Sequence, residues 1–202
     1  MNPVLLSASV PYPRSDKPVD AFYLESCDRT AIRESVRALC MVVLPETKLI
    51  FGGHPFISPL ILQVAEGLGR TSNVVIYQSK HFAKVAPAES LAFGNIVWTE
   101  AVDADRDASL LAMRHQMITE WDFGAGIFIG GMEGVVEEYE LFRTFHPQAP
   151  AIPVASTGAA ASRLLDQASK YLTRETSEAL KSDLAYRALF RRLLPGAVAA
   201  SG

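Results

Sequence analysis

Short apolar runs alternate with segments of helical periodicity along almost the whole chain, and this alternation limits the fold more than any other feature. The apolar runs predict buried strands at residues 3–9, 48–51, 74–77, 95–98, 125–129 and 151–155. The periodic segments predict helices at 28–44, 58–68, 105–120, 133–145, 159–172 and 177–194. Strands and helices that alternate in this way form a parallel sheet with helices on both faces. We therefore expect an α/β fold, a doubly wound, mostly parallel, Rossmann-like sheet with an extra C-terminal helix.

Several residues mark where the predicted helices begin and end. Asp28 is an N-cap for the first helix, and Pro45 follows its end. Pro59 is tolerated in the first turn of the second helix, and Gly69 is a stop signal. Residues 80–94 give no clear pattern, and the tail after Pro195 is expected to fray. We expect one domain over 1–202, with a core at about 3–168 and a C-terminal helix at 177–194.

Composition and charge exclude several classes of protein. With 202 residues, 49% of them hydrophobic and 20% charged, the chain can bury a core of ordinary size. No apolar stretch approaches the ~20 residues of a membrane span, and residues 1–13 do not resemble a signal peptide. Cys27 and Cys40 suit a reducing compartment, and the four histidines have no metal-ligand spacing. A net charge of -3 argues against binding to nucleic acid. We expect a cytoplasmic protein without a membrane, nucleic-acid or metal partner, and we expect no cofactor.

Small and hydroxylated residues follow the predicted strands. In an open parallel sheet, ligands bind outside the carboxyl ends of the strands, so the residues just past each strand form the candidate site. These positions are Ser7 and Ser9, Gly52 to His54, Gln78 and Ser79, Thr99, Gly130 to Gly134, and Ser156 to Gly158. Such a composition suits a crevice in which the backbone approaches a ligand closely.

The segment around Gly130, Gly131 and Gly134 carries the strongest signal for ligand binding. A buried strand runs into the glycines and then into a helix, so backbone N–H groups and the positive end of the helix can hold a phosphate. The segment is neither a P-loop nor a G-x-G-x-x-G fingerprint. Glu133, Glu137 and Glu138 make the helix start acidic, so a plain helix start with solvated acids is an equal alternative.

Three further segments are weaker candidates, and each has a structural alternative. Gly52 and Gly53 form a second glycine turn, after which His54 either contacts a ligand or is solvated. Ser156 and Thr157, before Gly158, either cap a helix or contact a ligand. Arg14, beyond Ser7 and Ser9, is either a phosphate partner or an ordinary surface arginine.

At these segments the sequence resembles the SLOG superfamily, the Rossmann-like group that joins the DprA/Smf proteins with the LOG (Lonely Guy) phosphoribohydrolases. The resemblance rests on residues 5–11, the turn at 51–55 and the segment 129–137, and it covers about 3–168 without the last helix. These segments look like those of the stand-alone SLOG proteins of bacterial conflict systems. The resemblance implies a site for a nucleotide or nucleotide-derived signal in an anti-phage or stress pathway, with a separately encoded effector as a candidate partner.

The resemblance also implies a pair of catalytic residues. LOG enzymes carry an arginine on the helix before a Pro-Gly-Gly-x-Gly-Thr-x-x-Glu motif and cleave the N-glycosidic bond of a nucleoside monophosphate. Arg114 and Glu137 match that arginine and that glutamate in register. Ile129 stands in place of the proline, Gly134 comes one residue late, and the threonine is missing. These departures favour binding without turnover.

Two functions from different classes follow, and the sequence leaves both open. The first is a binding protein that senses or processes a nucleotide-derived ligand, and the alternative is a LOG-type N-glycosidase that uses Arg114 and Glu137. A third reading, an oxidoreductase, lacks the dinucleotide fingerprint. The ligand-binding candidates are Ser7, Ser9, Arg14, Gly52, Gly53, His54, Gly130, Gly131, Met132, Glu133, Gly134, Ser156, Thr157 and Gly158. Abundant apolar residues on the helices at 105–120 and 133–145, and the dimers common among LOG-like proteins, predict a homodimer or larger assembly, although those residues also suit a core face.

Overall fold

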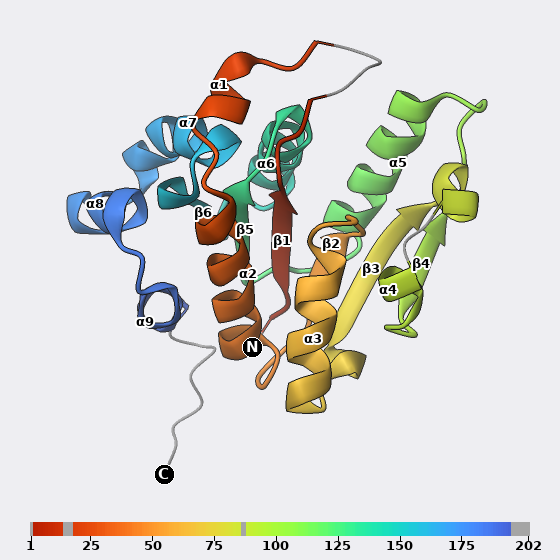
Figure 1. Cartoon of the computed structure of the whole chain (residues 1–202), viewed down its shortest axis with the longest axis horizontal. Coiled ribbons are helices and arrows are strands. Elements are labelled where there is room, and N and C mark those ends of the chain that lie inside the picture. Colours follow the sequence, from red (N-terminus) through yellow and green to blue (C-terminus); the bar gives the residue numbers. More distant parts are fainter. Residues whose placement is uncertain (1, 14–17, 86–87, 195–202) are drawn as a thin grey trace.

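A computed structural model describes residues 2–13, 18–85 and 88–194, and its central feature is a parallel six-stranded sheet (Figure 1). The strands lie in the order β4-β3-β2-β1-β5-β6, and every pairing between neighbours is parallel. They are β1 (Val4–Ser9), β2 (Leu49–Gly52), β3 (Val74–Ser79), β4 (Ile96–Thr99), β5 (Ala125–Gly130) and β6 (Ala151–Val154). The predicted α/β class with a parallel sheet is confirmed.

The first strand of the chain lies in the middle of the sheet. β1 pairs with β2 on one side and with β5 on the other, and the β1–β5 register runs from Val4 opposite Ala125 to Ser9 opposite Gly130. Strands β2 to β4 extend outward on one side, and the chain then crosses back to place β5 and β6 on the other. The strand order therefore reverses beside β1, and in such sheets the crevice at the reversal is where ligands bind.

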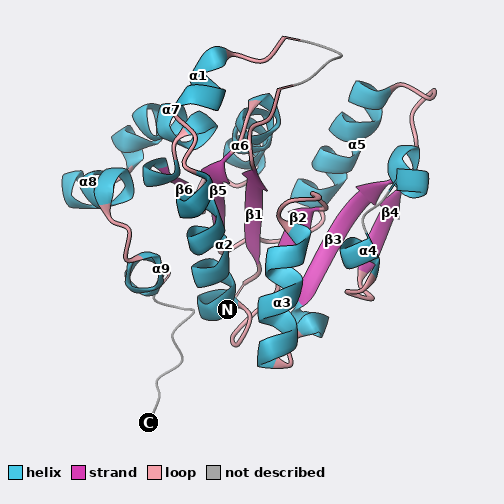
Figure 2. Cartoon of the chain, viewed as in Figure 1, coloured by secondary structure: helices cyan, strands magenta, loops and turns pink. Residues whose placement is uncertain are grey.

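Helices cover both faces of the sheet (Figure 2). They are α1 (Ala21–Glu25), α2 (Arg29–Val43), α3 (Ser58–Leu68), α4 (Ala88–Leu91), α5 (Arg106–Thr119), α6 (Glu133–Phe145), α7 (Ala159–Ala168), α8 (Arg174–Ser182) and α9 (Tyr186–Leu193). Among the residues that the structure describes, no helix is long and apolar enough to cross a membrane.

The core consists of two layers, one on each face of the sheet. Alternate residues of a strand point to opposite faces, so Val4 and Leu6 pack with α2, α3 and α9, whereas Leu5 packs with α5, α6 and α7. In Figure 1, α2 and α3 stand in front of the strands. This two-layer packing is the doubly wound arrangement that the sequence predicts.

The predicted helix starts at 28 and 58 are correct because their signals act locally. Asp28 accepts a hydrogen bond from the Ala31 N–H at 2.8 Å and so caps α2. Pro59 occupies the first turn of α3, and Gly69 ends it with a left-handed backbone at φ 63°.

The predicted single helix at 177–194 is wrong, because the structure has two helices there, α8 and α9. Asp183 has an extended backbone, and its carboxylate accepts a hydrogen bond from the Ala185 N–H at 2.8 Å. Aspartate competes with helical hydrogen bonds in this way, and here it starts a turn. The predicted helix at 159–172 is also too long: α7 ends at Ala168 and a short 3-10 turn follows. Helix α1 was not predicted, and the unclear segment at 80–94 contains a 3-10 stretch at Lys80–Val85 and α4.

Candidate functional site

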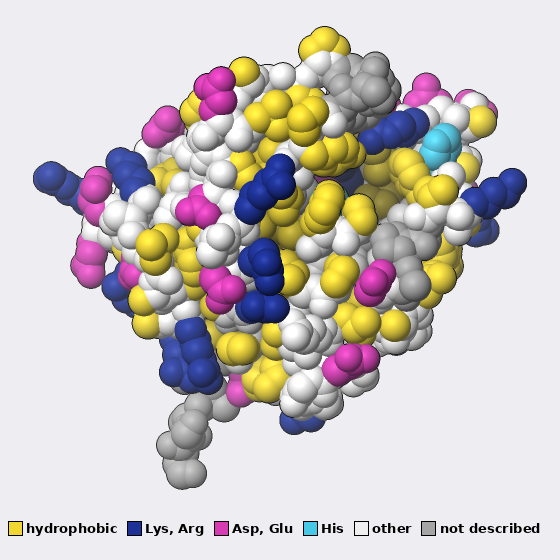
Figure 3. Space-filling view, viewed as in Figure 1, with side chains coloured by type: hydrophobic (Ala, Val, Ile, Leu, Met, Phe, Trp, Pro, Cys, Tyr) yellow, Lys and Arg dark blue, Asp and Glu magenta, His cyan; other side chains and the backbone are white. Residues whose placement is uncertain are grey.

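A cleft of about 980 Å³ opens at the carboxyl ends of β1, β2 and β3, between the first turns of α5 and α6. Figure 3 shows hydrophobic side chains gathered around a hollow in the upper part of the molecule, on the side of α5. The residues that line the cleft include Ser9, Tyr12, Gly52, Gly53, His54, Gln78, Phe82, Arg106, Asp107, Met113, Arg114, Met132, Glu133, Gly134, Glu137 and Glu138. The cleft thus lies beside β1, where the strand order reverses.

His54 gives one end of the cleft an uncharged hydrogen-bonding ring. Its Nδ1 accepts a hydrogen bond from the Phe56 N–H at 3.3 Å, so the proton of the neutral ring lies on Nε2. Burial lowers the pKa of His54 to about 4. The rings of His54 and Phe56 lie 5.9 Å apart, and Tyr12 lies 6.5 Å beyond Phe56. His54 and Tyr12 line the cleft, with Phe56 beside them outside its lining, and their rings can stack on a flat ligand.

We expect His54 to make the free energy of unfolding depend on pH. Between pH 4 and 6.5 the unfolded chain binds a proton on His54 that the folded chain does not, so stability rises with pH across this window and levels off above it. Urea unfolding at pH 4.5 and 7 should show a larger gain for the native protein than for His54→Asn, by about 2 kcal/mol after allowance for the partial exposure of the ring. Equal gains in the two proteins would contradict the neutral assignment.

Gln78 lies at the carboxyl end of β3, directly under the glycine turn after β2. The residue is 8% exposed, it lines the cleft, and its Oε1 is buried without a hydrogen-bond partner within the described part of the chain. A Cβ on Gly53 would overlap this oxygen and would lie 3.1 Å from Ile76 Cγ2. The missing side chain of Gly53 is thus what makes room for the amide of Gln78.

The opposite end of the cleft is held by ion pairs between α5 and α6. Arg114 Nη1 pairs with Glu137, and Arg114 Nε donates to Glu138 at 3.2 Å. The side chains of Arg114 and Glu138 are only 14% and 12% exposed, whereas that of Glu137 is 51% exposed. A Cβ on Gly134 would lie 2.5 Å from Arg114 Nη2, so the absence of a side chain at Gly134 gives the guanidinium its place on α6.

The turn at Gly130 and Gly131 lies behind the cleft wall and does not line it. Gly130 N–H donates to Thr157 Oγ1 and Gly131 N–H donates to the Ser9 carbonyl, both at 2.9 Å. The Gly131 carbonyl in turn accepts from Ala160 N–H at 3.1 Å. Both glycines have positive φ, 57° and 88°. Their N–H groups are therefore already engaged within the protein, and the turn joins β1, β5 and α7.

Residues 22–194 match the family model of the SLOG cluster3 family. The chain belongs to the SLOG cluster3 family. A search of curated proteins found no match. The matched range ends after α9, so it includes the two C-terminal helices and extends beyond about residue 168, where the resemblance was expected to end. Membership fits a nucleotide-related function in general.

In this SLOG chain, the cleft brings together about half of the predicted site residues. Arg114, Glu137, Ser9, Gly52, Gly53, His54, Met132, Glu133 and Gly134 line it. Ser7 is buried in β1, and its hydroxyl has no hydrogen-bond partner among the described residues. Arg14 lies outside the described residues.

The predicted residues after β6 occupy a different place in the SLOG fold. Thr157 Oγ1 donates to the Val154 carbonyl at 2.6 Å, and Ser156 Oγ lies 3.2 Å from the Tyr186 hydroxyl on α9. A Cβ on Gly158 would overlap the Ser26 carbonyl. Contacts with the N-terminal segment and with α9 thus fill the space beyond β6, away from the cleft.

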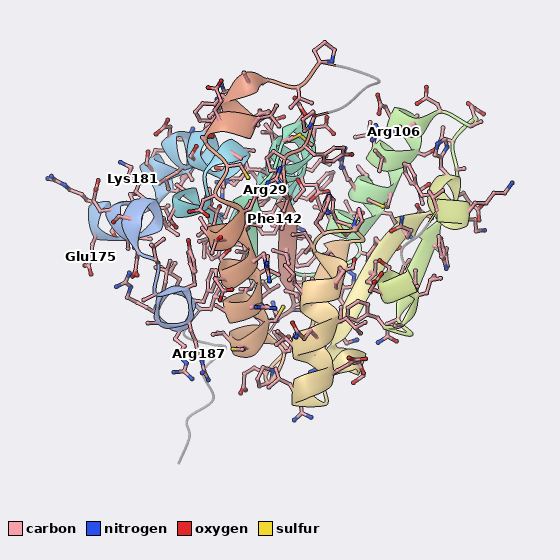
Figure 4. The ribbon with its side chains drawn as sticks, in the orientation of Figure 1. Arg29, Arg106, Phe142, Glu175, Lys181 and Arg187 are labelled. Carbon is pink, nitrogen blue, oxygen red and sulfur yellow. The ribbon has the colours of Figure 1, made fainter. Side chains whose placement is uncertain are left out.

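Three residues of the cleft were not predicted as site residues: Arg106 in the first turn of α5, Met113 further along the same helix, and Tyr12 in the loop after β1. Arg106 lies at the start of α5 in Figure 4 and pairs with Asp107 at 2.7 Å. A helix that follows a strand in a parallel sheet begins at the carboxyl edge, so the position of Arg106 after β4 was the available signal. Within the described residues, no group of three or more His, Cys, Asp and Glu side chains is arranged to hold a metal ion.

Proposed function

We propose that this protein binds a nucleotide or nucleotide-derived ligand in the cleft, as a sensor or processing component of a bacterial defence or stress-signalling pathway. One observation carries the proposal: a 980 Å³ cleft lies where the strand order reverses, in a chain that belongs to a SLOG family. That volume is at the upper end of the range for small-molecule sites. The defence pathway comes from the resemblance to conflict-system proteins.

The charges of the cleft favour a ligand with few phosphates. Arg106 and Arg114 are opposed by the carboxylates of Asp107, Glu133, Glu137 and Glu138. The first turn of α6 has no side-chain cap, so its N–H groups can take one phosphate oxygen or two. A triphosphate would meet strong repulsion from the surrounding carboxylates. We therefore propose a monophosphate or a ligand of comparable charge.

A nucleotide panel tests the proposed function. The purified protein is denatured, and released small molecules are identified by mass spectrometry. Calorimetry then measures binding of AMP, GMP, ATP, NAD and a cyclic dinucleotide. Support would be a co-purified nucleotide or a saturable isotherm, with AMP bound more tightly than ATP. If no nucleotide co-purifies and none of the panel binds, the proposed function is wrong.

The second candidate function is a LOG-type N-glycosidase, which the pairing of Arg114 with Glu137 favours. Cleavage of an N-glycosidic bond builds positive charge on the ribose, which a carboxylate beside it can stabilise. The exposed Glu137 can turn toward a ligand while Arg114 stays on Glu138. However, Arg114 is already held by two carboxylates and is less free to hold a phosphate. For this reason we place binding ahead of turnover.

We predict that any release of adenine from AMP depends on both Arg114 and Glu137. Glu137→Gln should lower the rate at least ~100-fold, since a neutral amide stabilises the developing charge poorly. The Glu137 carboxylate is half exposed, so the same change should leave stability almost untouched. Released adenine is measured by chromatography, with Glu140→Gln, an exposed residue on the same helix, as the control. Release that survives Glu137→Gln and Arg114→Ala would exclude this site.

Our proposal includes a homodimer formed through the outer faces of α5 and α6. Most of the apolar residues that suggested it are at least partly buried within the chain, among them Met113, Met117 and Phe142. Phe145 remains exposed at 43% and does not line the cleft, whereas Leu111, exposed at 53%, does line it. We expect light scattering at tens of micromolar to give the dimer mass, and Phe145→Glu to give the monomer. A monomer mass for the unmodified chain would overturn this part of the proposal.

A further inference from the structure

Among the described residues that line the cleft, Gln78 alone has a buried side-chain oxygen or nitrogen without a hydrogen bond. Its carboxamide is nine-tenths buried, yet Oε1 makes no hydrogen bond within the described residues. An unpaired buried acceptor destabilises a fold, so a purely structural position would favour an apolar side chain of the same size. A buried carboxamide without a partner in the protein therefore indicates that its partner is a bound ligand.

The position of Gln78 lets that partner be a ligand. The residue lines the cleft from the end of β3, and its oxygen lies against Gly53. Rotation of the amide about its last side-chain bond exchanges the oxygen and the nitrogen, so either atom can face the cleft. After this rotation the oxygen faces the cleft and can accept a hydrogen bond from a ligand N–H group, while the rest of the side chain keeps its position.

The surroundings of Gln78 suit a flat, uncharged ring. His54 stands on the same turn as Gly53, and the hydrogen bond from Phe56 to its Nδ1 leaves an N–H at Nε2. Phe82, on the 3-10 stretch after β3, and Tyr12 add aromatic surface to this part of the lining. The ion pairs of Arg114 lie on the other wall, on α5 and α6. The cleft thus has a neutral, aromatic end and a charged end.

We propose that Gln78 is a specificity-determining residue, which recognises an amino group on the base of the bound nucleotide. The charged end of the cleft then holds the sugar and phosphate. This inference rests on the proposed function and adds the identity of the recognised group. A base whose amino group faces Gln78 pairs with the carboxamide oxygen, whereas a base without that amino group leaves the oxygen unpaired. Sites that hydrogen-bond a ligand group discriminate against analogues that lack the group.

The first experiment needs no ligand. Gln78→Met keeps the volume of the side chain and removes the unpaired acceptor, so the melting temperature should stay level or rise by about 2–4 °C. Gln63→Met serves as the control, since Gln63 is exposed on α3 and its Oε1 accepts a hydrogen bond from Arg37 at 2.8 Å. A clear fall in the melting temperature of Gln78→Met would show that Gln78 is needed for the fold and would overturn the inference.

The second experiment compares nucleotides that differ in a base amino group. The pairs are AMP with purine riboside 5′-monophosphate, GMP with IMP, and NAD with nicotinamide hypoxanthine dinucleotide. In at least one pair the native protein should bind the amino compound about tenfold more tightly, as expected for one buried hydrogen bond. Gln78→Met should bind both members of that pair equally, at the weaker level.

A substitution at the neighbouring Gly53 tests the role of the Gln78 amide independently. Gly53→Ala would place a methyl group where Gln78 Oε1 lies, so it should also remove the preference for the amino compound. Gly67→Ala is the control, because its Cβ would meet nothing within 4 Å, and the preference should persist. Equal binding of all pairs by the native protein, or a preference that survives Gln78→Met, would overturn the inference but leave the proposed function standing. If none of the six compounds binds, the inference falls, and the broader panel then decides the proposed function.

Discussion

Replacing Gly131 with valine should prevent the protein from folding, rather than simply empty the cleft. Gly131 has φ 88°, a backbone conformation that a β-branched residue does not tolerate. Its Cβ would also lie 2.6 Å from Val135 Cβ on α6. Overpacking and backbone strain act together here, so we expect a loss of more than ~4 kcal/mol of stability. Circular dichroism and the yield of soluble protein measure the result.

Gly134→Ala is the matched comparison, because Gly134 lies on the same segment but on the cleft side. Its Cβ would meet the end of the Arg114 side chain, which can move away, and its φ is not positive. This variant should therefore fold, with Arg114 displaced from α6. A folded, stable Gly131→Val protein would show that the turn is less constrained than its contacts indicate.

Arg114→Ala should destabilise the protein by about 3 kcal/mol, because it leaves the largely buried carboxylate of Glu138 without its partner. The exposed carboxylate of Glu137 remains solvated after the change and contributes little to this loss. Chemical denaturation measures the free energy of unfolding. Most of the loss should be recovered when Glu138→Gln is added, since the buried charge is then removed.

The control for this prediction is Arg106→Ala, which breaks an exposed ion pair with Asp107. Exposed pairs contribute at most about 1 kcal/mol, so this variant should be close to the native protein in stability. An equal loss of the free energy of unfolding in Arg114→Ala and Arg106→Ala would show that the pair between α5 and α6 does not stabilise the fold as described. The same would follow if Glu138→Gln restored none of that free energy in the Arg114→Ala protein.

Local signals predicted the elements of this fold well, and long-range contacts account for what they missed. The cap at Asp28 and the stop at Gly69 depend on neighbours within a few residues, so the sequence shows them. The break at Asp183 is also local, but an aspartate is common on helix surfaces and rarely ends a helix. The parallel sheet followed from the alternation alone, because few other folds accept such a pattern.

The candidate site was harder to predict, since the environment of each residue depends on distant strands. The glycines at 130 and 131 look like a phosphate loop in the sequence, but Thr157 and Ser9 take up their N–H groups. In the sequence, Gln78 is only one of several polar residues at the strand ends. Its unpaired oxygen is visible only in the structure, where Gly53 after the neighbouring strand lies against it. Arg114 and Glu137 were paired by resemblance, and the structure places them in contact.

The central position of β1 has a consequence for the order in which the chain can assemble during synthesis. One edge of β1 can pair as soon as β2 emerges, but the other edge has to wait for β5, which begins at Ala125. Until then, a growing chain carries an apolar strand with an open edge, the kind of surface that pairs with other unfinished chains. Pairing across so long a loop is also slow, because the ends must first find each other. We therefore expect nascent chains of this protein to be prone to aggregation until β5 leaves the ribosome.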